Sequence, residues 1–441
     1  MFGPRLHVGL AVAIALALSA CATPIERNGI ADARLAATAE VEGMPDVRYW
    51  ADEVPRDPVA EIKRRTAHIP PIARDAKRLD GRQIVETLAL SGGGSDGAFG
   101  AGVLAGWTKR GDRPEFEVVT GVSAGAIIAP FAFLGSSEDQ KLHTIWTQYK
   151  QDEVVTPELF SGLFGGPALA STEPLENLIA QYIDRDFLDR IAAQYKRGRI
   201  LMVLTTNLDA QRPVVWNMGE IALNRSPQAT ELFRKVILAS AAIPAAFPPV
   251  KIEVEAGGHT YDELHVDGGT TREVFVLPVE APLKAFDTLY SKPPIRRFFI
   301  IKNGKAAPEQ EVVKATTLQI ASRSISTLIK SQNQGEVYHI YRVALDGGAD
   351  FNFLSVPASF DYKTKQIYDP KYQSALYAEG VAEGRKGIWL KAPPGQTPAT
   401  IPPTAKPLSP PAKPSPPEPG PSADAPAPAP KRQLPVAAAS G

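Results

Sequence analysis

Short apolar runs recur through the middle of the chain, and helical patterns separate them. The runs are rich in Val, Ile, Leu and Phe, which is typical of buried strands. They are residues 84–90, 118–120, 200–207, 214–216 and 297–302. Helices are expected at residues 98–109, from 124 onward, and at 231–241, 309–330 and 372–390. Strands that alternate with helices imply an α/β fold in three α/β/α layers, with a mostly parallel central sheet.

The first residues form a targeting segment rather than part of the fold. Arg5 precedes an apolar stretch at 8–18 that is too short to span a bilayer as a mature helix. The stretch ends in Leu-Ser-Ala-Cys at Cys21, the sole cysteine, which resembles a bacterial lipobox whose cysteine is diacylated. By resemblance to Gram-negative lipoprotein sorting, Ala22 after the cysteine favours the outer membrane, with the protein anchored by lipid in the cell envelope and facing the periplasm. An ordinary signal peptide cut near Ala20, or an uncleaved anchor, remains an alternative.

Composition divides the rest of the chain into three parts. Residues 21–82 are charged and interrupted by prolines, with one short helix expected at 59–68. Tyr49 and Trp50 suggest that part of this N-terminal extension docks on the main domain, residues 83–392. The 49 residues from 393 to 441 include 17 prolines, too many to bury a core, so this tail is expected to be disordered.

Charge and cysteine content exclude several function classes. Lys plus Arg and Asp plus Glu each number 48, so net charge gives no case for nucleic acid or for a polybasic membrane patch. A single cysteine excludes a disulfide framework and a thiolate zinc cluster. No metal or cofactor is expected, and protein partners are not indicated. The apolar, glycine-rich stretch at 160–170 is either a lid or acyl-chain wall, or a plain surface loop.

A G-x-S-x-G pentapeptide lies between the predicted strand at 118–120 and the helix that follows. It comprises Gly121, Ser123 and Gly125. A strand-to-helix junction is the context of a nucleophile elbow, a sharp turn that exposes a serine hydroxyl. The glycines leave room, because a Cβ at either position is expected to collide across the turn. The pentapeptide is short and common, so a glycine-bounded loop that merely contains a serine stays open at this point.

A glycine-rich turn follows the predicted strand at 84–90. Its glycines are Gly92, Gly93, Gly94 and Gly97. Backbone N–H groups at a strand–turn–helix junction form an anion site, for a phosphate or for a developing oxyanion. The same glycines match G-x-G-x-x-G, which raises a dinucleotide site as an alternative. Glu117 stands at the usual offset of the ribose-binding acid, but it opens the second strand instead of closing it.

A third motif supplies an acidic residue. Asp267, followed by Gly268 and Gly269, comes after an apolar segment at 236–249 that ends in two prolines. In order and spacing, the glycine-rich turn, the G-x-S-x-G serine and this D-G-G aspartate resemble the patatin-like phospholipase family over residues 85–278. The three motifs together are far more specific than any one of them.

The resemblance implies a lipid acyl hydrolase of the phospholipase A, lysophospholipase or esterase type, acting on a lipid or another ester. Ser123 is then the nucleophile and Asp267 the base, in a dyad without a histidine. The resemblance assigns the oxyanion hole to the amides of Gly92, Gly93 and Gly94, and supporting roles to Gly97, Gly121, Gly125, Gly268 and Gly269. An ordinary aspartate titrates near about 3.9 and is a weak base. The dyad therefore requires direct contact between the two side chains, in an apolar site that raises the pKa of the aspartate.

Two departures from the family pattern concern the site. The family's glycine-rich turn usually carries a basic residue where this chain has Asp96. Ser95 or Asp96 is expected to cap the following helix. After the D-G-G motif the family tends to show Asn-x-Pro, whereas this chain has Thr-Thr-Arg-Glu at 270–273. These departures leave a second class open: an envelope lipoprotein that binds a lipid or an anion but is catalytically impaired.

A Ser–Asp–His triad is the alternative within the same chemistry. Ser123, Asp267 and His339 follow the chain order of α/β-hydrolases. However, residues 337–341 alternate between apolar and polar like the edge of a strand, where a lone histidine is more often structural.

Overall fold

The computed structural model describes residues 25–68, 78–154, 156–157, 170–277, 281–362, 364 and 368–398. The predicted leader with Cys21, nearly all of the apolar stretch at 160–170, and the proline-rich tail from 399 lie outside the described residues. The predictions about them therefore stay predictions.

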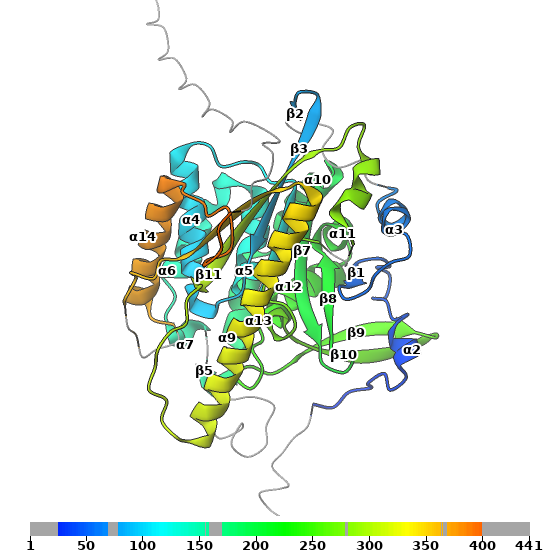
Figure 1. The fold of residues 1–441 in the computed structure, drawn as a ribbon. Helices are drawn as coiled ribbons and strands as arrows, with labels where there is room; N and C mark the ends of the chain where they lie inside the picture. Colours follow the sequence, from blue (N-terminus) through cyan, green and yellow to red (C-terminus); the bar gives the residue numbers. More distant parts are fainter. Residues whose placement is uncertain are drawn as a thin grey trace, which may run out of the picture. The chain divides into compact units, whose positions relative to one another are not determined.

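A central sheet organises the described part of the chain (Figure 1). Its strands in spatial order are β1 (Arg48–Trp50), β8 (Arg212–Asn217), β7 (Ile200–Asn207), β4 (Val118–Val122), β3 (Arg82–Leu90), β11 (Ile295–Lys305) and β12 (Asp350–Val356). The strands from β7 to β12 are parallel to one another. The predicted mostly parallel sheet is therefore confirmed, and all five predicted strands are present as β3, β4, β7, β8 and β11.

Antiparallel strands join the sheet next to β7. β9 (Val250–Ala256) and β10 (His259–Asp267) form a hairpin, and the last three residues of β10 pair with β7. The short strand β2 (Arg78–Leu79) pairs with β3, and β5 (Thr156–Pro157) pairs with β6 (Ala170–Ser171) in a separate two-stranded sheet. The hairpin was not predicted, yet it brings Asp267 to the carboxyl end of β7.

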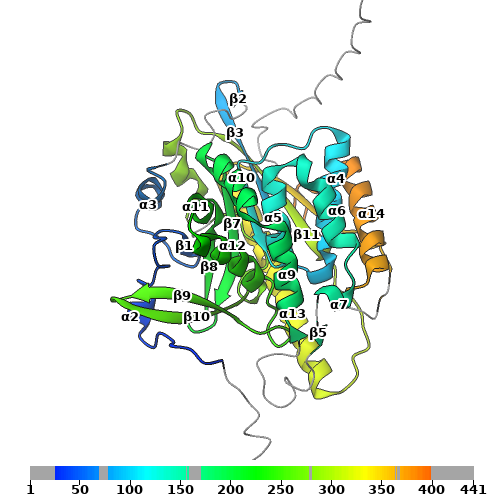
Figure 2. The same cartoon turned by 180° about the vertical axis from the view of Figure 1, so that it is seen from behind.

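Helices cover both faces of the sheet (Figures 1 and 2). They are α2 (Ala33–Ala36), α3 (Pro58–Arg65), α4 (Gly97–Arg110), α5 (Ala124–Leu134), α6 (Asp139–Thr147), α7 (Gln151–Val154), α9 (Glu173–Tyr182), α10 (Arg185–Lys196), α11 (Met218–Leu223), α12 (Pro227–Ser240), α13 (Thr317–Gly347) and α14 (Pro370–Lys386). Short 3-10 turns add η1 (Gly94–Asp96), η2 (Ser136–Glu138), η3 (Gly268–Thr270) and η4 (Leu283–Leu289). None of the described helices has the length and apolar character needed to cross a membrane.

The strand β11 shows how the two-sided core arises from sequence. Phe298 and Ile300 point to the core under α13, whereas Phe299 and Ile301 join the core under α4 and α5. Side chains alternate between the two faces of a strand, so a continuous apolar run fits a sheet that is covered on both faces. The three-layer architecture follows from this pattern.

The helix predicted at 309–330 is placed differently in the structure, and the strand edge expected at 337–341 is wrong. α13 begins at Thr317 and continues to Gly347. Val337, Ile340 and Ala344 are buried at spacings of three and four residues, which is the period of a helix packed on a core. Alternation over only five residues was too short a window to detect this period.

The N-terminal extension contributes an edge strand to the sheet. β1 pairs with β8 in antiparallel register, with Tyr49 opposite Val215. The expectation that Tyr49 and Trp50 dock on the main domain is therefore confirmed, and the short helix expected at 59–68 is present as α3.

Candidate active site

Ser123 lies at the sharp junction between β4 and α5, as the G-x-S-x-G pattern predicted. Its φ is 53° and its ψ is −120°, a left-handed φ that is strained for a residue with a Cβ. A Cβ on Gly121 would lie 2.4 Å from the Gly125 carbonyl oxygen, and one on Gly125 would lie 2.3 Å from the Leu90 carbonyl oxygen. Any larger residue at either position would push α5 away from the ends of β3 and β4.

Asp267 ends β10 and lies against Ser123, although 144 positions separate them in the chain. The Ser123 hydroxyl donates a hydrogen bond of 2.6 Å to Asp267 Oδ2. The other carboxylate oxygen, Oδ1, accepts a bond of 2.7 Å from Gly269 N–H. Ser123 and Asp267 are each only 5% exposed. The direct contact that a dyad requires is thus present and shielded from bulk water.

Burial raises the pKa of Asp267 to about 7, because the ionised carboxylate loses hydration in an apolar surrounding. The hydrogen bonds from Ser123 and Gly269 favour the ionised form and offset only part of this effect. A carboxylate with a raised pKa is a stronger base toward a serine hydroxyl than an exposed aspartate is. The environment that the dyad hypothesis required therefore surrounds this side chain.

Two further hydroxyl groups fix the pair to β7. Ser123 N–H donates a 2.9 Å bond to Ser240 Oγ, and the Ser240 hydroxyl donates a 2.7 Å bond to the Leu204 carbonyl. The Thr206 hydroxyl donates a 3.0 Å bond to the Asp267 carbonyl. Neither hydroxyl was expected to contribute. Ser240 lies in the family-like segment before Asp267, so a sequence signal existed for it.

The glycine-rich turn offers fewer amides than expected. Gly92 N–H donates a 3.1 Å bond to the Glu273 carbonyl, so this amide is occupied, contrary to the prediction. Gly93 has a φ of 149°, and a Cβ on it would lie 1.9 Å from the Asn303 carbonyl oxygen. Among the described residues, none accepts a hydrogen bond from Gly93 or Gly94 N–H, and Gly94 lines the same pocket as the serine. These two amides remain as donors for an oxyanion.

Asp96 does not cap α4 through its side chain, contrary to expectation. Its carboxylate instead accepts a 2.7 Å bond from the Tyr372 hydroxyl on α14. Burial raises the pKa of Asp96 to about 6, and the bond from Tyr372 lowers it by less. Where the family usually has a cation, this chain therefore has a carboxylate that joins the glycine-rich turn to α14.

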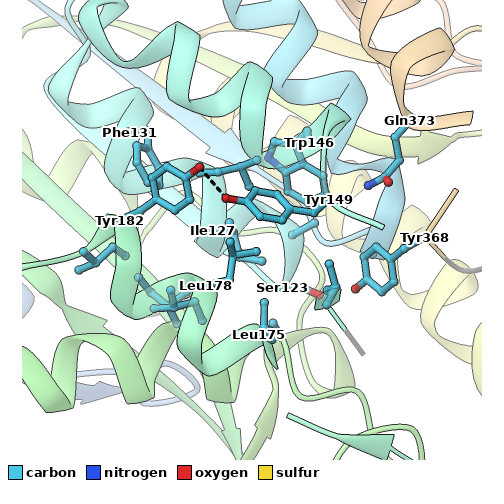
Figure 3. Close-up of a pocket in the computed structure, with 18 of the residues that line it drawn as sticks. Ser123, Ile127, Phe131, Trp146, Tyr149, Leu175, Leu178, Tyr182, Tyr368 and Gln373 are labelled. Carbon is cyan, nitrogen blue, oxygen red and sulfur yellow. Dashed lines mark hydrogen bonds between the residues drawn. The ribbon is translucent and has the colours of Figure 1, made fainter. Parts of the chain in front are cut away.

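An apolar pocket opens beside Ser123 and extends along α5 (Figure 3). Ile127 and Phe131 line it from α5, and Leu175 lines it from α9. Tyr368, which no sequence feature indicated, lies beside the serine, and burial raises its pKa to about 12. A mostly hydrocarbon lining with few polar groups suits an acyl chain.

The histidines near this region have other surroundings. His339 is on the exposed side of α13 and lines a separate groove, together with Gln332 and Val343. His265 is buried on β10, where its ring nitrogens lie 2.9 Å from Thr205 Oγ1 and 3.0 Å from a carboxylate oxygen of Glu263. The triad alternative therefore receives no support from the site's geometry.

Glu117 is placed away from the glycine-rich turn. Its carboxylate accepts a 2.6 Å bond from Glu86 N–H next to the amino end of β4, whereas the turn follows the carboxyl end of β3. The two strands are parallel, so the amino end of β4 and the carboxyl end of β3 lie at opposite ends of the strands. This placement does not fit a ribose-binding acid. In the part of the chain that the structure describes, no group of three or more His, Cys, Asp or Glu side chains is arranged to hold a metal ion.

Comparison with known proteins identifies the domain that holds the site. Residues 88–281 match the family model described as Patatin-like phospholipase. The chain carries a patatin-like phospholipase domain. The matched part of this patatin-like domain includes Gly94, Ser123 and Asp267, whereas β11, β12, α13 and α14 follow it. None of the curated proteins matches the chain. Among solved structures, that of VipD from Legionella pneumophila is similar with 14% identity and a TM-score of 0.34, over 70% of this chain and 69% of that chain.

Proposed function

We propose that this protein is a serine hydrolase that releases acyl groups from lipid esters by means of a Ser–Asp dyad. The observation that carries the proposal is the 2.6 Å contact between Ser123 Oγ and Asp267 Oδ2 beside an apolar pocket. The patatin-like domain supports the hydrolysis of lipids in general. The raised pKa of the buried carboxyl supports its role as the base.

In the first step of the proposed reaction, Ser123 Oγ attacks the ester carbonyl carbon while Asp267 takes the hydroxyl proton. Negative charge develops on the carbonyl oxygen, and the amides of Gly93 and Gly94 stabilise it. The bond to the alcohol oxygen then breaks, and the alcohol leaves with the proton from Asp267. Water next attacks the acyl-serine and gives a proton to Asp267. The carboxylic acid leaves as the proton returns to Ser123 Oγ.

We also propose that the enzyme is held in a bacterial envelope through Cys21. The apolar leader at 8–18 and the lipobox-like position of this sole cysteine support the proposal. Several acyl chains on one residue anchor a protein far more durably than a single chain does. Ala22 supports placement in the outer membrane, facing the periplasm. An enzyme anchored in this way is held next to its lipid substrate.

A hydrolysis assay with purified full-length protein in detergent tests the proposed function. The panel contains p-nitrophenyl esters, phosphatidylcholine, lysophosphatidylcholine and diacylglycerol, and the control protein is Ser123→Ala. We expect the wild type to release acid from at least one lipid class and the variant to release none above background. Equal rates for the two proteins on every substrate contradict the proposal and favour a lipid-binding role.

The pH dependence of hydrolysis is expected to follow the ionisation of Asp267. The base must be deprotonated to accept the serine proton, and burial raises its pKa to about 7. Therefore kcat/KM should rise as pH increases through about 7 and level off above it. The measurement is kcat/KM between pH 5 and pH 9 on one water-soluble ester.

Glu117→Gln is the matched control for this profile. Burial also raises the pKa of Glu117 to about 7, but this residue precedes β4, whereas Ser123 follows the carboxyl end of the same strand. The variant should keep the same midpoint. A wild-type midpoint near 4, or a midpoint that disappears in Glu117→Gln, contradicts the assignment to Asp267.

Replacing His339 with alanine is expected to change kcat/KM by less than about twofold, as is typical of residues outside the reacting groups. The side chain belongs to a groove on α13 and not to the pocket beside the serine. The same ester assay measures the effect. A loss of two orders of magnitude or more in a folded variant would restore the triad hypothesis.

A further inference from the structure

The apolar pocket follows one face of α5 away from the nucleophile. Ser123, Ile127 and Phe131 all line it, and they are spaced by four residues, so they lie above one another on the helix. At a rise of about 1.5 Å per residue, Phe131 is roughly 12 Å from Ser123 along the helix axis. The distance along this helix face measures how far the pocket extends from Ser123.

Two tyrosines meet at the level of Phe131. The hydroxyl groups of Tyr149, before α7, and Tyr182, the last residue of α9, lie 2.9 Å apart and form a hydrogen bond (Figure 3). The Tyr182 ring meets the Phe131 ring edge-on, with centroids 6.4 Å apart. Its contact with the Tyr149 ring is also edge-on, at 6.5 Å. A ring cluster from three separate segments therefore lines the pocket at this level, and a single hydrogen bond joins two of its members.

Separating the two hydroxyl groups is energetically unfavourable. Each hydroxyl has the other as its partner in a mostly apolar surrounding. A hydrocarbon that separates them cannot replace the lost bond, so the separated groups are left unsatisfied or must turn to water. Extended chains advance by about 1.2 Å per bond, since three backbone bonds of a peptide span roughly 3.6 Å. A depth of roughly 12 Å therefore holds at most about ten carbon atoms beyond the serine oxygen.

We propose that the Tyr149–Tyr182 pair limits the length of the acyl group that this enzyme accepts, so that medium-chain acyl esters are its preferred substrates. This inference rests on the proposed function and names the acyl class of the same site. Each methylene that is buried before the limit improves kcat/KM by up to roughly fourfold. Beyond the limit, further methylenes gain nothing and have to displace the tyrosines.

A series of p-nitrophenyl esters with 4, 6, 8, 10, 12 and 16 acyl carbons tests the proposal on full-length protein in detergent. For the wild type, we expect kcat/KM to peak at 8 or 10 carbons and to fall at least about tenfold at 16 carbons. In Tyr182→Ala and Tyr149→Ala, the peak should move to 12 carbons or more. The Phe variants keep the ring and lose only the hydrogen bond, so they should raise the activity on 12 carbons by less than the Ala variants do.

Two other variants sharpen the test. Gln181→Ala changes an exposed neighbour of Tyr182 on α9 and should leave the profile of the wild type in place. Ile127→Trp fills the pocket one helical turn above the serine and should move the peak to about 4 carbons. The tyrosine variants and Ile127→Trp thus shift the optimum in opposite directions, and Gln181→Ala does not shift it.

The outcomes separate this proposal from the proposed function. An active wild type whose profile is unchanged in both Ala variants overturns the length limit and leaves the hydrolase intact. Equal rates for the wild type and Ser123→Ala on every ester overturn the hydrolase itself. If Tyr182→Ala does not fold, Tyr149→Ala decides, because it removes the other half of the same hydrogen bond.

Discussion

Replacing Ser123 with alanine, or Asp267 with asparagine, is expected to lower kcat/KM for ester hydrolysis by roughly 10⁴-fold. Alanine removes the attacking oxygen. Asparagine keeps the shape of the side chain but cannot accept the hydroxyl proton, and its amide group donates where the carboxylate accepted. In the proposed reaction, the 2.6 Å bond between the two residues makes them one functional unit. The double variant should therefore be no slower than either single variant, because losses within one unit are not additive.

Matched controls separate this effect from a general loss of structure. Ser136→Ala and Glu253→Gln change exposed residues of the same chemical types, and both should keep the activity of the wild type. Circular dichroism and thermal unfolding establish that the dyad variants are folded. If Asp267→Asn kept more than a tenth of the activity while Ser123→Ala was inactive, another group would have to be the base.

Local steric requirements made the sharp turn at Ser123 predictable from sequence. Ser123 needs a left-handed φ, and the two flanking glycines are required because the helix and neighbouring strands approach within van der Waals contact. All of this information lies within five consecutive residues. The partnership with Asp267 was different. It spans 144 positions, and it was predictable only because three motifs matched a family pattern, not from local physics.

Partners that lie far apart in the chain explain where the sequence predictions failed. The Gly92 amide is occupied by the Glu273 carbonyl, and Asp96 is bound by Tyr372, which lies 276 positions away. A hydrogen-bonding group does not reveal its partner in one sequence, because turns, strands and helices all leave groups to be satisfied. The strand edge wrongly expected at 337–341 had another cause, because a window of only five residues favoured the period of a strand over that of the helix α13.

The edge strand β1 carries the least predictable stabilising contact. Arg48 lies in the charged extension, and no sequence feature indicated a buried partner for it. In the structure its guanidinium donates two hydrogen bonds to Glu263, of 2.6 Å and 3.1 Å. The side chains are only 4% and 3% exposed, and Glu263 precedes Asp267 on β10 by four residues. The extension thus reaches the strand that holds the proposed base.

Arg48→Met is expected to lower the free energy of unfolding by about 3–5 kcal/mol. Burial alone would raise the pKa of Glu263, but the bond with His265 and the charge of Arg48 outweigh it and lower that pKa to about 2. Without the arginine, the buried Glu263 keeps its bond with His265 but loses the compensating positive charge, so it either stays ionised at a cost or takes up a proton. The measurement is the midpoint of urea unfolding, converted with the slope of the transition.

A second arginine on the same edge of the sheet provides the comparison. Arg212 also pairs with a carboxylate, Asp52, but these side chains are 27% and 38% exposed. Water already solvates both charges there, so Arg212→Met should cost less than about 1 kcal/mol. The double variant Arg48→Met/Glu263→Gln also removes the carboxyl group left without its arginine, and it should recover at least about half of the stability lost by Arg48→Met. The guanidinium carbon of Arg48 also lies 5.2 Å and 5.9 Å from the ring centroids of Trp50 and Trp216. If the double variant recovered no stability, the loss would come from this packing and not from the buried charge.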